Sequence, residues 1–98
     1  MNILGDIGNS ETKIFLVSSN NKIIKQTSFP SKKINNKVLL SKFRPLLTDF
    51  KKIEKILFCS VVPKSFVLIK KFLSKKIKKK CFEVKMLKLR SLINIKVN

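Results

Sequence analysis

The stretch NILGDIGNSETKIFLVS, residues 2–18, predicts two strands joined by a short polar turn. Its first apolar run ends in Asp-Ile-Gly, and its second run is rich in apolar and β-favouring side chains. The turn sequence SNN follows, and residues 22–29 predict a third strand that is ended by Pro30. We therefore expect residues 2–29 to form an antiparallel meander of three strands.

A helix and a buried strand are expected next. Residues 37–53 carry apolar side chains at a helical period, although Pro45 should kink this helix or start a new turn. Residues 55–62, KILFCSVV, are almost continuously apolar over the length of a strand. Such a run is typical of a central strand that is buried on both faces.

The rest of the chain continues the alternation. Pro63 is well placed as the first residue of a helix that continues over residues 64–80. The apolar face of this helix consists of Phe66, Ile69, Leu73 and Ile77. Residues 81–87 predict a further strand, and residues 93–98 are interpreted as the beginning of another.

This order of elements, β-β-β-α-β-α-β, predicts an α/β fold with a mixed sheet and helices packed on it. A length of 98 residues suits one small domain or part of a larger one. The chain stops in an alternating, strand-like stretch without a helix cap or a turn. We therefore expect residues 1–98 to be a truncated N-terminal half, incomplete at its C-terminus.

The composition is strongly basic, with 23 Lys and Arg against five acidic residues and no His, a formal net charge of +18. Such a chain attracts polyanions, whether RNA, anionic lipid or a phosphorylated substrate. The abundant residues Lys, Asn, Ile and Phe have AT-rich codons, so genomic base composition alone also explains this bias. The sequence leaves both explanations open.

Composition and motifs also exclude several classes of protein. A hydrophobic content of 44% argues against disorder, and no apolar run approaches the roughly 18 residues of a membrane span. No signal-peptide pattern is visible. Cys59 and Cys81 stand outside any metal-ligand spacing, as in proteins of a reducing compartment. We expect a soluble, cytoplasmic protein without a membrane partner.

The motif DIGNSETK contains the ingredients of a site for phosphate and metal. The carboxylate of Asp6 can hold Mg²⁺ or its waters, and Gly8 permits positive φ and close approach of a bulky anion. The N–H groups of a tight turn can bind an anion. Asn9 and Ser10 add side-chain donors, and Lys13 adds a mobile positive charge. The same residue types are common in plain hairpin turns, so the motif alone leaves both readings open.

A second motif makes the pattern more specific. CSVVP, residues 59–63, closes the buried strand about fifty residues after the first motif. The pair, followed by RSLINIKVN at residues 90–98, resembles the type III pantothenate kinases. This family belongs to the superfamily of acetate kinase, sugar kinases and actin. The resemblance implies a ribonuclease-H-like mixed sheet and an ATPase domain. It also implies ATP-dependent phosphorylation of pantothenate to 4'-phosphopantothenate, the first committed step toward coenzyme A.

The resemblance implies a role for each residue of the first motif. Asp6 would organise the Mg²⁺ that accompanies ATP. Gly8, Asn9 and Ser10 would line the phosphates. Lys13 would steady their charge, although a solvent-facing position on the strand is an equal alternative.

On the substrate side the resemblance points to Ser60 and Asn94. Ser60 ends a central strand, where ligands of open α/β sheets bind, although a helix-capping role is the main alternative. The chain departs from the family where Leu92 takes the place of a glycine. The family's general base is an aspartate in a later motif, and the chain's only aspartate besides Asp6 is Asp49. We therefore expect the catalytic aspartate beyond Asn98, and no turnover by these residues alone.

The resemblance further implies ATP, Mg²⁺ and a monovalent cation (K⁺ or NH₄⁺), pantothenate as substrate, and a homodimer of the full-length protein. One alternative is another small-molecule kinase or a regulator with the same fold. A second alternative is a small basic nucleic-acid-binding module that uses the lysine face of residues 70–80. Against it, most phenylalanines lie in apolar runs, and only Arg44 and Arg90 can make bidentate contacts. We therefore expect no nucleic-acid partner.

Overall fold

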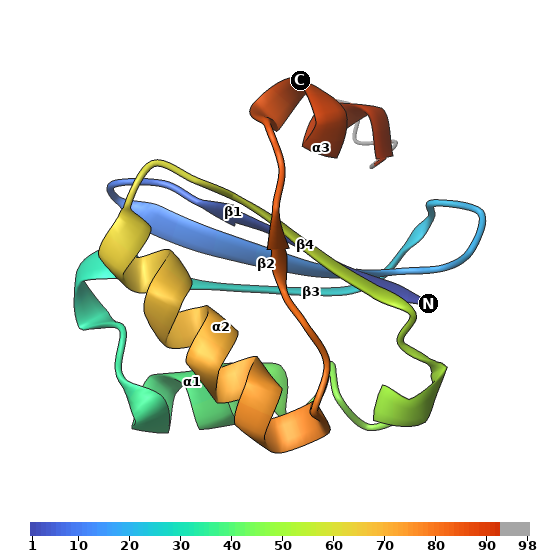
Figure 1. Ribbon diagram of the computed structural model, residues 1–98, viewed down its shortest axis with the longest axis horizontal. Coiled ribbons are helices and arrows are strands. Elements are labelled where there is room, and N and C mark those ends of the chain that lie inside the picture. The colour runs from blue at the N-terminus through green and yellow to red at the C-terminus, as the bar shows by residue number, and fades with distance from the viewer. Residues whose placement is uncertain (93–98) are drawn as a thin grey trace.

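A mixed sheet of five strands, in the order β3-β2-β1-β4-β5, organises the chain (Figure 1). The computed structural model describes residues 1–92. Its strands are β1 (Asn2–Ile7), β2 (Glu11–Val17), β3 (Ile23–Pro30), β4 (Lys55–Ser60) and β5 (Phe82–Glu83), and its helices are α1 (Asn36–Phe43), α2 (Pro63–Ile77) and α3 (Met86–Leu92). Two short 3-10 helices cover Ser31–Lys33 and Phe50–Lys52. The predicted α/β class and mixed sheet are confirmed.

The pairing of the strands confirms the meander and the buried central strand. β1 pairs antiparallel with β2, and β2 pairs antiparallel with β3. β4 then lies parallel to β1 on the opposite side from β2, after the crossover through α1. The short β5 extends the sheet by a second parallel pairing. β1 is therefore the strand on which both halves of the sheet meet.

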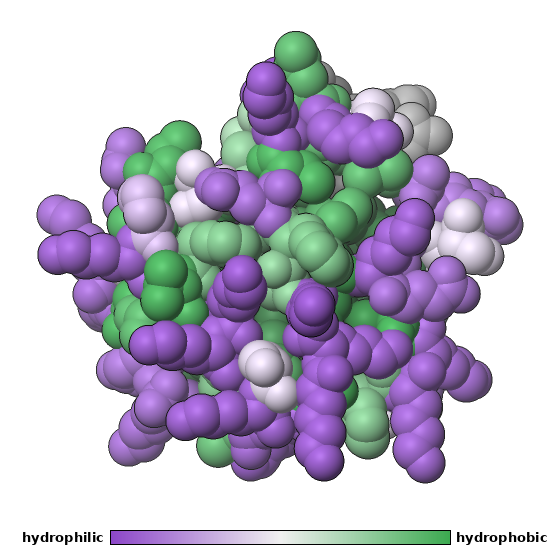
Figure 2. Space-filling model, viewed as in Figure 1, coloured by the Kyte–Doolittle hydropathy of each residue, from purple (hydrophilic) through white to green (hydrophobic). Residues whose placement is uncertain are grey.

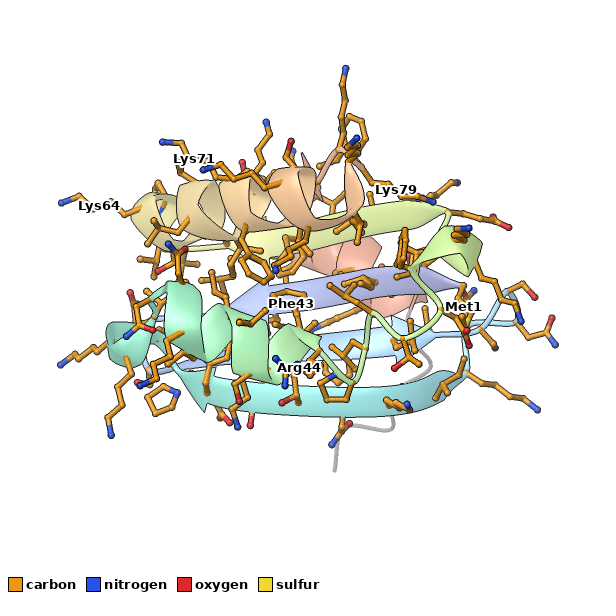
Figure 3. All side chains as sticks on the ribbon, turned by 90° about the horizontal axis from the view of Figure 1, so that it is seen from below. Met1, Phe43, Arg44, Lys64, Lys71 and Lys79 are labelled. Carbon is orange, nitrogen blue, oxygen red and sulfur yellow. The ribbon has the colours of Figure 1, made fainter. Side chains whose placement is uncertain are left out.

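One face of the sheet packs against α1 and α2 (Figures 1 and 3). Ile3, Ile7 and Ile14 project from the strands and are fully buried there. The two helices meet through Phe43 and Phe72, whose ring centroids lie 5.6 Å apart. This face holds the larger of the two apolar clusters in the described part of the chain.

The opposite face carries a smaller apolar cluster and a polar margin. Leu4, Phe15 and Cys59 pack there with Leu89 of α3. Successive side chains of a strand alternate between the two faces. Asp6, two residues after Leu4, therefore lies on this face, away from the main core.

Gly5 allows β1 and β4 to lie side by side on the helix face. It stands opposite Phe58 in the parallel register. A methyl group built on Gly5 would overlap the ring of Phe58, which is fully buried. The absence of a side chain at this position therefore provides the space that the ring fills.

The predicted helix over residues 37–53 is wrong in its second half, because α1 ends at Phe43. Its start is well defined, since the Asn35 side chain accepts the N–H of Val38 at 2.8 Å. Pro45 has no N–H to donate to a carbonyl in the preceding turn, so the helix stops there. A turn and the 3-10 helix Phe50–Lys52 replace the rest.

The predicted strand over residues 81–87 is also wrong beyond Glu83. Only Phe82 and Glu83 pair with β4, and α3 begins at Met86. Met86 and Leu89 are three residues apart and both pack on the second apolar cluster. A helix places residues at this spacing on one face, whereas a strand would place them on opposite faces. The strand predicted over 93–98 lies outside the described residues.

The second helix begins as predicted but ends three residues before the predicted Lys80. Pro63 occupies the first turn of α2, and the helix ends at Ile77 because Lys78 adopts a left-handed conformation with φ of 53°. Ile69, Leu73 and Ile77 are buried as expected, and Phe66 packs partly buried against the same core. No helix within residues 1–92 combines the length and apolarity required to cross a bilayer.

Replacing Gly5 with Ala should destabilise the fold by about 2–3 kcal/mol, because the new methyl group displaces the Phe58 ring. Urea unfolding of G5A, F58L and the double variant measures the effect. The smaller side chain that F58L introduces should relieve the clash, so the double variant should be more stable than the sum of the single changes predicts. Strict additivity would contradict the proposed contact.

The Cys81 thiol should be inert in the folded protein, because burial raises its pKa from an ordinary 9.0 to about 12, with Lys70 opposing this shift. The folded pKa lies above the unfolded one. The stability contributed by the protonated thiol is therefore complete below about pH 9 and is lost as the pH rises toward about 12. In a C59A variant, a disulfide reagent near pH 8 should label Cys81 at least about a hundredfold more slowly than in the unfolded chain. Equal rates would contradict the assigned burial.

Candidate functional site

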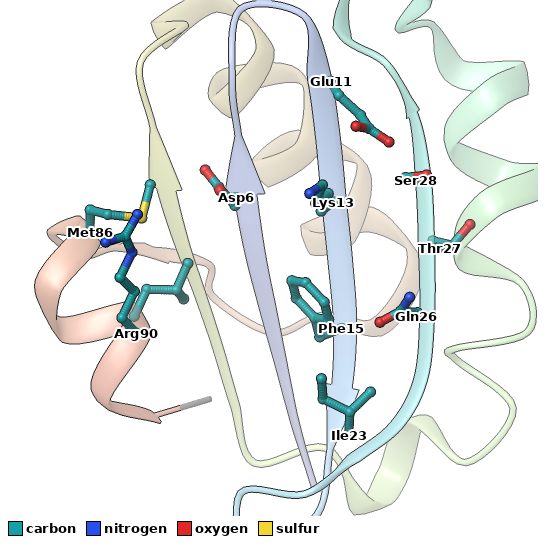
Figure 4. A pocket seen from close by; sticks show the side chains of 11 residues that line it. Asp6, Glu11, Lys13, Phe15, Ile23, Gln26, Thr27, Ser28, Met86 and Arg90 are labelled. Carbon is teal, nitrogen blue, oxygen red and sulfur yellow. The ribbon is translucent and has the colours of Figure 1, made fainter. Parts of the chain in front are cut away.

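A polar cleft of about 720 Å³ lies over the second face of the sheet, between the β1–β2–β3 meander and α3 (Figure 4). Its charged lining consists of Asp6, Glu11, Lys13 and Arg90. The remaining lining residues are Phe15, Ile23, Gln26, Thr27, Ser28, Met86 and Leu89. The cleft therefore joins an apolar floor to both carboxylates and cations.

Asp6 and Lys13 are cross-strand neighbours in the β1–β2 hairpin and share the cleft face. The Asp6 side chain is partly buried. Within residues 1–92 its carboxylate has neither a hydrogen bond nor an ion pair. A carboxylate without a protein partner in a polar cleft is suited to hold a cation or its waters.

The carboxylate of Asp6 affects a residue of the neighbouring strand. Cys59 stands opposite Asp6 in β4. Burial raises the pKa of the Cys59 thiol, and the carboxylates of Asp6 and Glu83 raise it further. The carboxylates of Asp6 and Glu83 therefore both lie close enough to Cys59 to affect its thiol.

The loop between β1 and β2 consists of Gly8, Asn9 and Ser10. The Gly8 N–H donates to the carbonyl of Glu11 at 3.0 Å. The N–H groups of Asn9 and Ser10 donate to no other group in the described part of the chain, and both residues are exposed. The loop therefore presents backbone donors that are free to bind an anion.

Gly8 does not use the positive φ that its residue type permits, since no glycine among the described residues adopts one. A methyl group on Gly8 would instead lie 3.1 Å from the Glu11 carbonyl oxygen, which is a tight contact. The absence of a side chain at Gly8 thus permits the turn to close, with the backbone in an ordinary conformation.

The structure places only some of the residues that the sequence predicts for the site in the cleft. Asp6 and Lys13 line the cleft, whereas Gly8, Asn9 and Ser10 are not part of its lining and form the loop that begins two residues after Asp6. Ser60 is not part of the cleft lining. Its Oγ accepts the Val62 N–H at 3.0 Å and donates to the Val62 carbonyl at 2.9 Å. Asn94 lies outside the described residues.

The helix-capping role considered for Ser60 differs in detail from what is observed. The N-cap of α2 is Val62, and no side chain caps it. Ser60 instead closes a local turn between β4 and the helix, and it shares the helix side of the sheet with Phe58 by strand alternation.

Sequence reasoning missed several polar residues of the cleft. Glu11, Gln26 and Ser28 come from β2 and β3, and Arg90 comes from α3. The period of two along β2 could have found Glu11, because it shares a face with Lys13. The expectation of a strand over 81–87 left no helix there to carry Arg90 toward the sheet.

Comparison with known proteins places these features in a family. The model of the type III pantothenate kinases matches residues 2–98. The chain belongs to the type III pantothenate kinase family. The type III pantothenate kinase of Pelagibacter ubique (strain HTCC1062) is 53% identical over 98 residues, which is 100% of this chain and 40% of that relative. The chain therefore spans less than half the length of this relative.

Membership in the type III pantothenate kinase family confirms the resemblance drawn from the motifs DIGNS and CSVVP. The surface of α2 is rich in lysine. Lysine side chains project from this helix, and hydrophilic residues cover much of the molecular face in Figure 2. Five of the eight phenylalanines are buried, and Phe66 of α2 lies partly buried under Lys70. Phe50 and Phe82 are exposed, and Phe50 lines a groove together with Lys76 of α2.

Proposed function

We propose that this chain forms the N-terminal ribonuclease-H-like ATPase domain, residues 1–98, of an enzyme that phosphorylates pantothenate to 4'-phosphopantothenate. The observation that carries the proposal is the pairing of two features at one end of the β1–β2 hairpin. These are the Asp6 carboxylate and the N–H groups of Asn9 and Ser10, none of which has a partner within residues 1–92. Membership in the type III pantothenate kinase family supports the nature of the reaction.

The loop is suited to the phosphates of ATP. Phosphoryl transfer depends on positioning and on neutralising the negative charge of the phosphates. The N–H groups of Asn9 and Ser10 supply donors, and their exposure leaves them accessible to a ligand. Lys13 and Arg90 supply positive charge from two sides of the same cleft.

The Asp6 carboxylate fits Mg²⁺. This ion prefers oxygen ligands, keeps several waters and is usually bound by one or two carboxylates together with substrate phosphates. Asp6 has no protein partner in the described residues, and Glu11 provides a second carboxylate in the same cleft. When bound, Mg²⁺ would neutralise charge on the phosphates, while Asp6 would hold the ion or its waters.

The acceptor side and the general base complete the proposal. Ser60 and Asn94 remain proposed contacts on the pantothenate side, although the Ser60 hydroxyl is occupied by the Val62 backbone. Removal of the hydroxyl proton of pantothenate requires a carboxylate or His within hydrogen-bond reach. We assign this role to an aspartate beyond Asn98, in agreement with the greater length of the P. ubique relative.

The family resemblance also supports a monovalent cation, K⁺ or NH₄⁺, and a homodimer of the whole protein. A cytoplasmic location is proposed on the same basis. The free thiols of Cys59 and Cys81 are typical of a reducing compartment and agree with it.

Binding of ADP to the chain should require Mg²⁺ and the Asp6 carboxylate. We expect D6N to bind Mg²⁺–ADP at least about tenfold more weakly, because a charged oxygen ligand is lost. The two proteins should bind ADP equally in EDTA. Isothermal titration calorimetry measures both affinities.

The matched control for this experiment is D49N, since Asp49 is exposed and is not part of the cleft lining. It should bind Mg²⁺–ADP like the unmodified chain. Equal binding by D6N and the unmodified chain in Mg²⁺ would overturn the metal assignment. Displacement of ADP by single-stranded RNA, without a need for Mg²⁺, would favour the basic nucleic-acid-binding module instead.

A further inference from the structure

Two buried hydroxyl groups lie beneath the loop that follows Asp6. The side chains of Thr12 and Ser31 are 0% and 5% exposed, and their oxygens lie 2.8 Å apart. Ser31 begins the 3-10 helix after β3, and its Oγ lies 2.6 Å from the carbonyl oxygen of Gly8. A residue 23 positions along the chain thus contacts the backbone of the loop directly.

The direction of these hydrogen bonds follows from the donors available. The Gly8 carbonyl can only accept, so the single proton of the Ser31 hydroxyl is donated to it. In the bond between the two hydroxyls Ser31 must then accept, and Thr12 donates. The bonds run from Thr12 to Ser31 to Gly8, and no buried side-chain polar atom in residues 1–92 lacks a partner.

Ser31 holds the loop at a second point as well. Its backbone N–H donates to the carbonyl of Ser10 at 3.1 Å. One residue therefore fixes the carbonyl groups on both sides of Asn9. Both bonds come from the interior of the molecule, where Ser31 is buried.

Because a peptide unit is planar, holding the Gly8 carbonyl also sets the direction of the following N–H group. The Gly8 carbonyl and the Asn9 N–H belong to one planar, trans peptide unit and point to opposite sides. Because the carbonyl is held toward Ser31, the Asn9 N–H is directed away from it. Asn9 is exposed, and its N–H is one of the free donors of the loop.

We propose that Ser31, held by Thr12, is a positioning residue that keeps the Asn9 N–H directed at a phosphate of the bound nucleotide. The inference rests on the proposed function, because it names the support for the same phosphate loop. Without the Ser31 hydroxyl the Gly8 carbonyl loses its partner, and the peptide between Gly8 and Asn9 is free to rotate. Glycine has few steric limits on such a rotation.

The test compares S31A with S31T, which keeps the hydroxyl, in the full chain. We expect S31A to bind Mg²⁺–ADP about tenfold more weakly and S31T to bind within about threefold of the unmodified chain. Amide NMR supplies a readout that a general loss of stability would not change. The Asn9 amide should shift strongly when ADP is added to the unmodified chain, and weakly in folded S31A.

Two further variants separate positioning from stability. S65A removes another buried serine, in α2 and outside the cleft lining, and should leave the ADP affinity unchanged. T12V keeps the volume of Thr12 but removes the donor to Ser31, and should weaken ADP binding about threefold. T12V decides the question if S31A does not fold.

The inference is overturned if folded S31A and T12V bind ADP like the unmodified chain, or if S65A weakens binding as much as S31A. Either result leaves the proposed function intact as long as the unmodified chain binds Mg²⁺–ADP. If the unmodified chain itself fails to bind, the proposed function is wrong, and the role of Ser31 falls with it.

Discussion

The ring of Phe58 lies against the backbone of Gly5, and this contact fixes how β1 pairs with β4. The parallel register places the two residues opposite each other on the helix side of the sheet. Alternation along β1 then assigns every other residue of that strand to a face. A shift by one residue would turn Asp6 toward the apolar core, where an unpaired carboxylate is costly. The polar cleft on one face therefore depends on tight packing on the other.

The two faces of the sheet thus contribute differently to the site. The helix face is apolar and supplies stability through α1 and α2, while the opposite face combines a small apolar cluster with charged residues. The buried hydroxyls of Thr12 and Ser31 lie where the core meets the loop. They connect the rigid interior to backbone donors that are exposed, which is how a short turn can be preorganised for a ligand.

The local features of this fold could be predicted from the sequence, and the long-range features could not. The meander, the apolar β4 and the start of α2 at Pro63 follow from composition and period over short windows. The helix α3 was missed because its apolar residues also fit a strand, and the length of α1 was overestimated although Pro45 indicated a break. Asp6 and Lys13 were found because one motif carries them both. Ser31 and Arg90 were not, since only folding brings them to the hairpin and the cleft.

Metal and phosphates are proposed to bind at the first hairpin, and paramagnetic NMR tests this most directly. Mn²⁺ in place of Mg²⁺, added with ADP, broadens the amide signals of residues near the bound metal. We expect selective broadening at Asp6, Gly8, Asn9 and Ser10, with the lysines of α2 unaffected. Broadening centred on α2, or spread evenly over the chain, would contradict it.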